Sequence, residues 1–172
     1  MSCLQLNTPE SFNIASDIFD KTCDEKQRKS SRIAHPYAFL AYQQGDLKKA
    51  LEIVEQCNSQ SVLRKCLQVF FLTKLQEYGK ALSKLDKLAK KSQNQNGNKI
   101  IFSVEVVRNL TQEIQSNSDK SLHVKLAQIF LQLDSVASIS EKSMFDLITD
   151  TIDVTNDMKY RREKNRIASQ QS

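Results

Sequence analysis

The stretch GDLKKAL (Gly45–Leu51) and the stretch QEYGKAL (Gln76–Leu82) share one pattern and lie 31 positions apart. A shift of the chain by that distance superimposes apolar residues on apolar residues and one lysine on another. It places Phe39-Leu40 on Phe70-Phe71, Leu47 on Tyr78, Lys49-Ala50-Leu51 on Lys80-Ala81-Leu82, Val54 on Leu85 and Cys57 on Leu88. The matches cover two helical segments and the turn between them, which predicts two copies of a helical hairpin.

The alanines at the centre of these stretches suggest how each hairpin packs. Ala50 and Ala81 are small, so the second helix of a hairpin can lie close against the first, while larger apolar residues fill the space between hairpins. One hairpin has too little apolar surface to be stable alone, so neighbouring hairpins must stack. We therefore predict an all-α protein, a helical-hairpin repeat or α-solenoid of about seven or eight helices, forming one domain over residues 1–157.

Capping signals divide the rest of the chain into further helices. Thr8-Pro9-Glu10 is typical of a helix start, a helix is expected over Ile33–Gln43, and Gly45 suits its end. Phe102-Ser103 predicts the start of a later helix, and the box Ser138–Glu141 predicts the start of the last one. No segment shows the alternation of a β-strand, so we expect none.

Charge is unevenly distributed along the 172 residues, whose net charge is +5. Residues 74–99 contain seven lysines and only two acidic residues, whereas residues 133–157 are strongly acidic. The basic end, residues 158–172, is predicted to be a disordered tail. This spread suits either polyanion binding or attraction between parts of the same chain.

The sequence offers no pattern for a cofactor, a metal, a small-molecule substrate or a membrane span. Its four cysteines, Cys3, Cys23, Cys57 and Cys66, form no CxxC pair, which favours free thiols. The three glycines are isolated, so no phosphate-cradling loop is expected, and no apolar run is long enough to cross a bilayer.

Catalytic side chains are equally scarce. His35 and His123 stand far apart, with no cysteine or carboxylate at the spacing of metal ligands. We interpret His35, which precedes Pro36, as part of a helix start and His123 as a packing or surface residue. The chain is therefore predicted not to be an enzyme.

Basic residues near the first helices are the candidate binding residues. The first helices of a hairpin solenoid line its concave surface, where the sequence places Arg28, Lys29, Arg32, Arg64 and Lys65. We predict that these residues contact the phosphates of a nucleic acid. The alternative is a tetratricopeptide-like scaffold that binds a protein segment in the same groove without nucleic acid. A second basic row, Lys80, Lys84, Lys87 and Lys91, is interpreted mainly as a solvated helix face.

The segment RIAHPYAFLAYQQGDLKKALEIVEQ (residues 32–56) resembles a hairpin of the pentatricopeptide repeat family. The segments LQLNTPESF (4–12), GDLKKALEIVEQ (45–56) and KIIFSVEVVRNL (99–110) resemble, in order, the C-terminal half of an animal mitochondrial member of that family. The resemblance implies a mitochondrial, RNA-binding α-solenoid that acts in transcript maturation without catalysis of its own.

The chain departs from the family pattern at the positions that read bases. The family's base-reading side chain lies nine residues before the turn glycine, which corresponds to Pro36 and Leu67 here. Neither side chain can form a hydrogen bond with a base edge, so contacts to phosphate, or to a protein partner, are expected instead. The sequence also shows no transit peptide and no earlier hairpins, which predicts that it is part of a longer mitochondrial protein.

Overall fold

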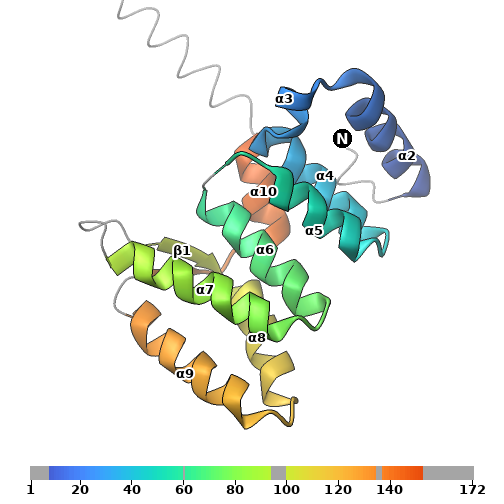
Figure 1. The fold of residues 1–172 in the computed structure, drawn as a ribbon. Helices are drawn as coiled ribbons and strands as arrows, with labels where there is room; N and C mark the ends of the chain where they lie inside the picture. Colours follow the sequence, from blue (N-terminus) through green and yellow to red (C-terminus); the bar gives the residue numbers. More distant parts are fainter. Residues whose placement is uncertain (1–7, 60, 94–99, 135–136, 153–172) are drawn as a thin grey trace, which may run out of the picture.

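The structure is a computed structural model that describes residues 8–59, 61–93, 100–134 and 137–152. These residues are mostly α-helical (Figure 1), which confirms the predicted all-α class. No helix within these ranges is long and apolar enough to span a bilayer. The predicted tail, residues 158–172, lies outside the described residues.

The helices follow one another with short connections, interrupted by two short strands. The elements are α2 (Pro9–Asp17), the π-helix η1 (Ile18–Thr22), α3 (Glu25–Arg28), α4 (Ser31–Gln43), α5 (Leu47–Gln56), α6 (Val62–Lys74), α7 (Tyr78–Gln93), β1 (Ile100–Ser103), α8 (Val104–Gln115), α9 (Lys120–Asp134), β2 (Ala137–Ser140) and α10 (Met144–Ile152).

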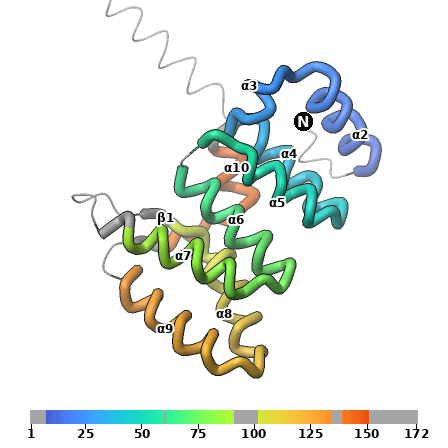
Figure 2. Tube along the Cα trace, in the orientation of Figure 1, coloured from blue at the N-terminus to red at the C-terminus, as the bar shows by residue number. Residues whose placement is uncertain are grey.

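Consecutive helices pack as hairpins around a continuous apolar core. Helix α4 packs against α5, and α6 packs against α7. The first helices also contact one another, α4 with α6 and α6 with α8, and α7 contacts α9 (Figure 2). Ala50 and Ala81, the two predicted contact alanines, are completely buried. Phe70 and Phe71 of α6 are among the largest fully buried side chains.

The C-terminal helix α10 returns to the first helices of both hairpins and lies against α4 and α6 (Figure 1). Its Met144 and Ile148 are fully buried, and the ring of Phe145 lies 6.2 Å from that of Phe39, between centroids. The backbone N–H of Met144 also donates a hydrogen bond of 2.9 Å to Glu105 Oε2 of α8. The face of α4 and α6 that was predicted to line an open concave surface is therefore partly covered by the chain itself.

The turns that end α4 and α6 have the same hydrogen-bond pattern, 31 positions apart. After α4, the N–H of Asp46 donates to Ala41 O and the N–H of Gly45 donates to Tyr42 O, both at 2.9 Å. After α6, Glu77 N–H donates to Leu72 O at 2.9 Å and Gln76 N–H donates to Thr73 O at 3.0 Å. Both sets are Schellman motifs, in which the residue after the cap adopts a left-handed conformation.

Gln76 occupies the left-handed position that Gly45 occupies in the first turn, with φ values of 61° and 85°. A side chain there costs about 1 kcal/mol, because the Cβ atom crowds its own backbone. We expect Gln76→Gly to raise the free energy of unfolding by about that amount and Gly45→Ala to lower it by about that amount. The space around a Cβ atom at Gly45 is empty to 4 Å, so the second effect is conformational. Urea denaturation of both variants measures the two changes. Variants as stable as the unaltered chain would contradict this account of the turns.

Two short strands replace the strand-free C-terminal half that the sequence predicts. Strands β1 and β2 pair in parallel, with Ile100 opposite Ala137 and Ser103 opposite Ser140, and α8 and α9 form the crossover between them. The predicted capping box at Ser138–Glu141 is wrong, because most of it lies in β2. The cap of α10 lies further along, where Ser143 Oγ accepts the N–H of Asp146 at 3.1 Å and the carboxylate of Asp146 accepts the N–H of Ser143.

The start of α4 also differs from its prediction. The helix begins at Ser31 rather than Ile33, so Pro36 lies inside it. Position 36 has no N–H to donate, and the helix continues past it to Gln43. His35 therefore does not help to begin the helix; it lies in the core, 1% exposed. The predicted first helix starts at Pro9 as expected, with Thr8 and Ser11 forming a reciprocal cap.

Candidate interaction surfaces

Arg28 and Lys29 lie at the end of α3 and line an open groove of about 560 Å³ between α3 and α5. Arg28 Nε donates to Cys23 O at 3.0 Å, and Lys29 forms an ion pair with Glu25. The groove carries equal numbers of basic and acidic side chains, because Lys49 joins the two basic residues and Asp20, Glu25 and Glu52 are the acidic ones. Its mixed charge makes it a weak site for a polyanion.

Lys49 in the same groove is held by aromatic rings. Its Nζ atom lies 5.2 Å from the ring centroid of Tyr37 and 5.7 Å from that of Phe12. A hydrogen bond with the hydroxyl of Tyr37 and the charge interactions around Lys49 raise the pKa of the lysine, which therefore stays protonated. These contacts tie α2 to α4 and α5 and occupy the ammonium group within the fold.

Arg64 is used to cap α5. Its Nε donates to Val54 O at 2.9 Å, one terminal nitrogen donates to Glu55 O at 2.8 Å, and the other donates to Ser59 O at 3.0 Å. The last carbonyls of a helix have no partner within the helix, and a cation there is favourable. Arg64 thus has a structural role, and its replacement would disturb the fold whether or not it also contacts a ligand.

The other two predicted phosphate ligands, Arg32 and Lys65, are not part of the lining of the groove between α3 and α5. Arg32 is exposed near the start of α4, and Lys65 is half-buried near the start of α6. Of the two base-reading positions, Leu67 is fully buried in α6 and Pro36 is half-buried in α4. The structure therefore brings Arg28 and Lys29 together but does not gather the five predicted basic residues into one groove.

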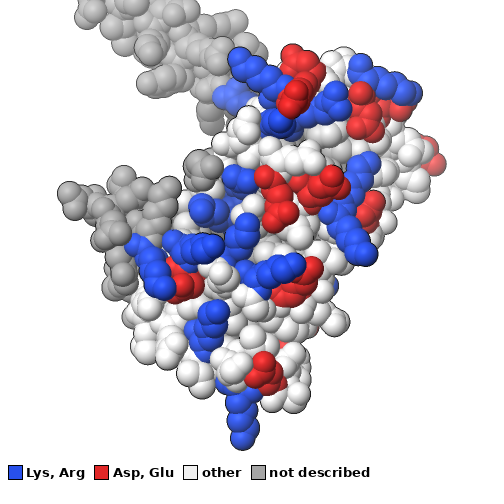
Figure 3. Space-filling view, in the orientation of Figure 1, with Lys and Arg blue, Asp and Glu red and all other residues white. Residues whose placement is uncertain are grey.

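Helix α7 carries Lys80, Lys84, Lys87 and Lys90, and basic side chains are prominent on the face of the molecule seen in Figure 3. Lys80 and Lys90 are mostly exposed and pair with Glu77 and Asp86 on the same helix. Lys84 pairs with Glu55 of α5 at 3.7 Å. Lys87 is exposed and has no acidic partner among the described residues. Exposed ion pairs contribute little to stability, so these lysines can exchange their partners for phosphates at small cost.

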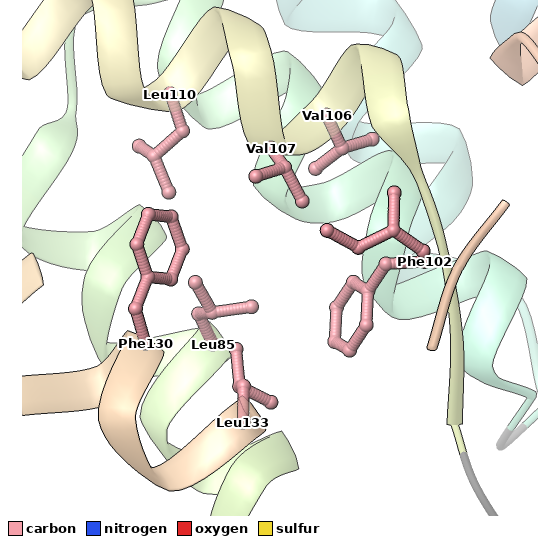
Figure 4. A pocket seen from close by; sticks show the side chains of 8 residues that line it. Leu85, Phe102, Val106, Val107, Leu110, Phe130 and Leu133 are labelled. Atoms are coloured by element: carbon pink, nitrogen blue, oxygen red, sulfur yellow. The ribbon is translucent and has the colours of Figure 1, made fainter. Parts of the chain in front are cut away.

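An apolar pocket lies between α7, α8, α9 and the strands (Figure 4). It has a volume of about 250 Å³ and is lined by Leu85, Phe102, Val106, Val107, Leu110, Phe130, Leu133 and Ile139. In the sequence, most of these residues belong to the apolar faces of separate amphipathic helices. Nothing in these faces indicated that the helices leave a space between them.

The two histidines lie in different surroundings. The Nε2 atom of His35 lies 3.7 Å from the Sγ atom of buried Cys57, and its Nδ1 atom has no hydrogen-bond partner among the residues that the structure describes. Burial, followed by the charge of Arg64, lowers the pKa of His35 to about 4, so its ring is neutral near pH 7. His123 Nε2 lies 2.8 Å from Asn117 O at a turn.

The cysteines and the acidic residues are the remaining side chains that could react or bind a metal. Cys23, Cys57 and Cys66 are free thiols, and burial raises the pKa of Cys66 to about 12, which keeps it protonated. Within the described ranges, no three His, Cys, Asp or Glu side chains gather as a metal ligand set.

Comparisons with protein-family models, with curated proteins and with solved structures give no match for this chain.

Proposed function

We propose that this chain is a non-catalytic helical-hairpin repeat protein that binds mitochondrial RNA through its phosphates and acts in RNA maturation. The mitochondrial setting and the role in maturation rest on the resemblance of residues 32–56 to a pentatricopeptide repeat hairpin. The remaining support comes from the helices themselves and from the positions of their lysines.

The repeat arrangement is supported by equivalent positions in two consecutive hairpins. Ala50 and Ala81 are both buried without exposure, and the turns before them share one Schellman pattern. A third pair, α8 and α9, continues the stack, since α8 contacts α6 and α9 contacts α7. Stacked hairpins of this kind form a solenoid, whose long surface suits an extended ligand.

The lysine row of α7 is the observation that carries the RNA proposal. Lys84, Lys87 and Lys90 recur every three residues along α7, with a rise of about 1.5 Å per residue; Lys87 and Lys90 are exposed, Lys84 is half-buried, and α7 has only one acidic residue, Asp86. Cations arranged in this way bind phosphates without reading base identity. The row replaces the predicted groove as the principal contact surface, because the groove has mixed charge and Arg64 is occupied by backbone carbonyls.

Replacement of the three lysines by glutamine tests this proposal. We expect the triple variant Lys84→Gln, Lys87→Gln, Lys90→Gln to bind a fluorescent single-stranded RNA about tenfold more weakly or worse, because about three phosphate contacts are lost. Fluorescence anisotropy measures the affinity, and circular dichroism checks that helicity is retained.

A matched control removes the same charge elsewhere. Arg108, Lys120 and Lys125 are exposed on α8 and α9, and their triple replacement by glutamine should leave RNA binding within about twofold. A third variant, with Arg28, Lys29 and Arg32 replaced by glutamine, tests the surface first predicted. Equal losses in all three variants would show that only net charge matters and would contradict a specific lysine row.

A protein-binding scaffold is the second candidate function, and the groove between α3 and α5 favours it. Its three basic and three acidic side chains complement a peptide of mixed charge better than a polyanion. Two results together would support this candidate over the first: no RNA binding at low salt, and a protein partner that stays bound after nuclease treatment.

A further inference from the structure

We infer that the pocket between α7, α8 and α9 binds the alkyl chain of a small amphiphile, a chain of roughly ten carbons. This inference concerns a ligand site separate from the lysine row. It does not depend on RNA binding.

The lining of the pocket comes from three helices and two strands that converge on a common space. Figure 4 shows Leu110 and Phe130 close together at one side of it, Phe102 at the other side, and Leu85 and Leu133 below. Phe102 and Leu110 are fully buried and belong to the core, so the walls are fixed by packing. The space is therefore a feature of the folded protein that a ligand would find already formed.

The chemistry of the lining selects an apolar ligand. All eight lining side chains that the structure describes are aliphatic or aromatic hydrocarbon. A polar group inside would lose its hydrogen bonds to water and gain none, which costs about 2 kcal/mol or more. An alkyl chain gains about 0.8 kcal/mol for each buried CH₂ group.

The volume sets the size of the ligand. A cavity of about 150 Å³ with a similar lining stays dry and binds benzene in another protein. The pocket here holds about 250 Å³. At the packing density of protein interiors, about 0.75, it would take about 190 Å³ of ligand atoms, which is more than one ring and close to a chain of about ten carbons.

The exposed part of the pocket lining belongs to β2. Ile139 of this strand is 57% exposed, whereas the other seven lining residues are buried or half-buried. A ligand can therefore place its alkyl chain among the buried side chains and leave its head group in water at Ile139. This geometry suits a single-chain amphiphile rather than a compact hydrocarbon.

Decan-1-ol and decanoate are the probes, with butan-1-ol as a short homologue. We expect both ten-carbon probes to bind the full chain one to one and to raise its melting temperature saturably, because they bind only the folded state. Butan-1-ol should produce no saturable rise at the same concentration. In a methyl-labelled NMR spectrum, decan-1-ol should shift Leu85, Val106, Val107 and Leu133 and leave the exposed Ile14 and Val124 unchanged.

Val107→Phe tests the site, because Val107 is a half-buried lining residue and the phenyl ring introduced there would fill the pocket. It should weaken decan-1-ol binding at least tenfold. The matched control is Val124→Phe on the exposed surface of α9, which should bind like the unaltered chain. The inference fails if Val107→Phe binds decan-1-ol normally, or if the methyl shifts fall on exposed residues. It also fails if neither ten-carbon probe binds the unaltered chain at its solubility limit.

Discussion

Ala50→Glu and Ala81→Glu are each expected to lower the free energy of unfolding by about 4 kcal/mol. Both alanines are completely buried at the contacts between helices, where a carboxylate is shielded from water. The carboxylate must remain unpaired, become protonated or force the helices apart. Because small domains are stable by about 5–15 kcal/mol, either variant should be largely unfolded at moderate urea concentrations.

Ala127→Glu provides the control for this loss, because Ala127 is an exposed residue within α9. The same substitution there keeps the carboxylate in water and should change stability by about 0.5 kcal/mol or less. Urea denaturation followed by circular dichroism compares the three variants. Midpoints for Ala50→Glu and Ala81→Glu that match that of Ala127→Glu would contradict the hairpin packing.

Acidification should destabilise the protein through His35, and this is the second large effect. The pKa of the ring falls from an ordinary value of 6.5 to about 4 on folding, because the ring is buried and Arg64 lies nearby. The unfolded chain therefore binds a proton that the folded chain rejects. The full contribution of neutral His35 is present above pH 6.5 and is lost as the pH falls toward 4. We expect a loss of about 2 kcal/mol between about pH 7.5 and about pH 5.

His35→Gln separates this effect from the titration of carboxylates. The variant has no imidazole, so its free energy of unfolding should fall by about 2 kcal/mol less over the same pH range. His123→Gln is the matched control, because His123 lies near the start of α9 and is only half-buried, and it should behave like the unaltered chain. Parallel pH profiles for all three proteins would show that His35 is not the titrating group.

The helices were predictable because their signals are local. Thr8 caps α2 and Gly45 ends α4, as the sequence indicated. The side chain of Asp46 accepts the N–H of Lys49 at the start of α5, and Asp119 accepts the N–H of Ser121 at the start of α9. Each of these features depends on residues within a few positions of one another.

The strands were not predictable in the same way. Ile100-Ile101-Phe102 has strand-forming residues, but it is stable as a strand only because Ala137–Ser140 lies beside it after two intervening helices. Ser138 and Glu141 have the spacing of a helix cap, yet the pairing with β1 takes Ser138 into a strand. A tertiary contact across 37 positions overrides the local signal.

The candidate sites depended even more on tertiary contacts. Arg64 was predicted to contact phosphate because of its charge. Its N–H groups donate to backbone carbonyls at the end of α5, and the sequence does not show that this end lies beside Arg64. The sequence places His35 at a helix start, yet it lies buried within α4, beside Cys57 at the end of α5 of the same hairpin. The apolar pocket arises from the spacing between three helices, which apolar periodicity alone cannot predict.

The dependence of RNA affinity on salt tests the proposed function most directly. For single-stranded RNA bound through about three or more phosphate contacts, log K should fall linearly with log salt concentration with a slope of about −2 or steeper. The slope should be similar for RNAs of different sequence, since Pro36 and Leu67 cannot read bases. An affinity that does not change with salt, or no RNA binding at low salt, would contradict the proposal.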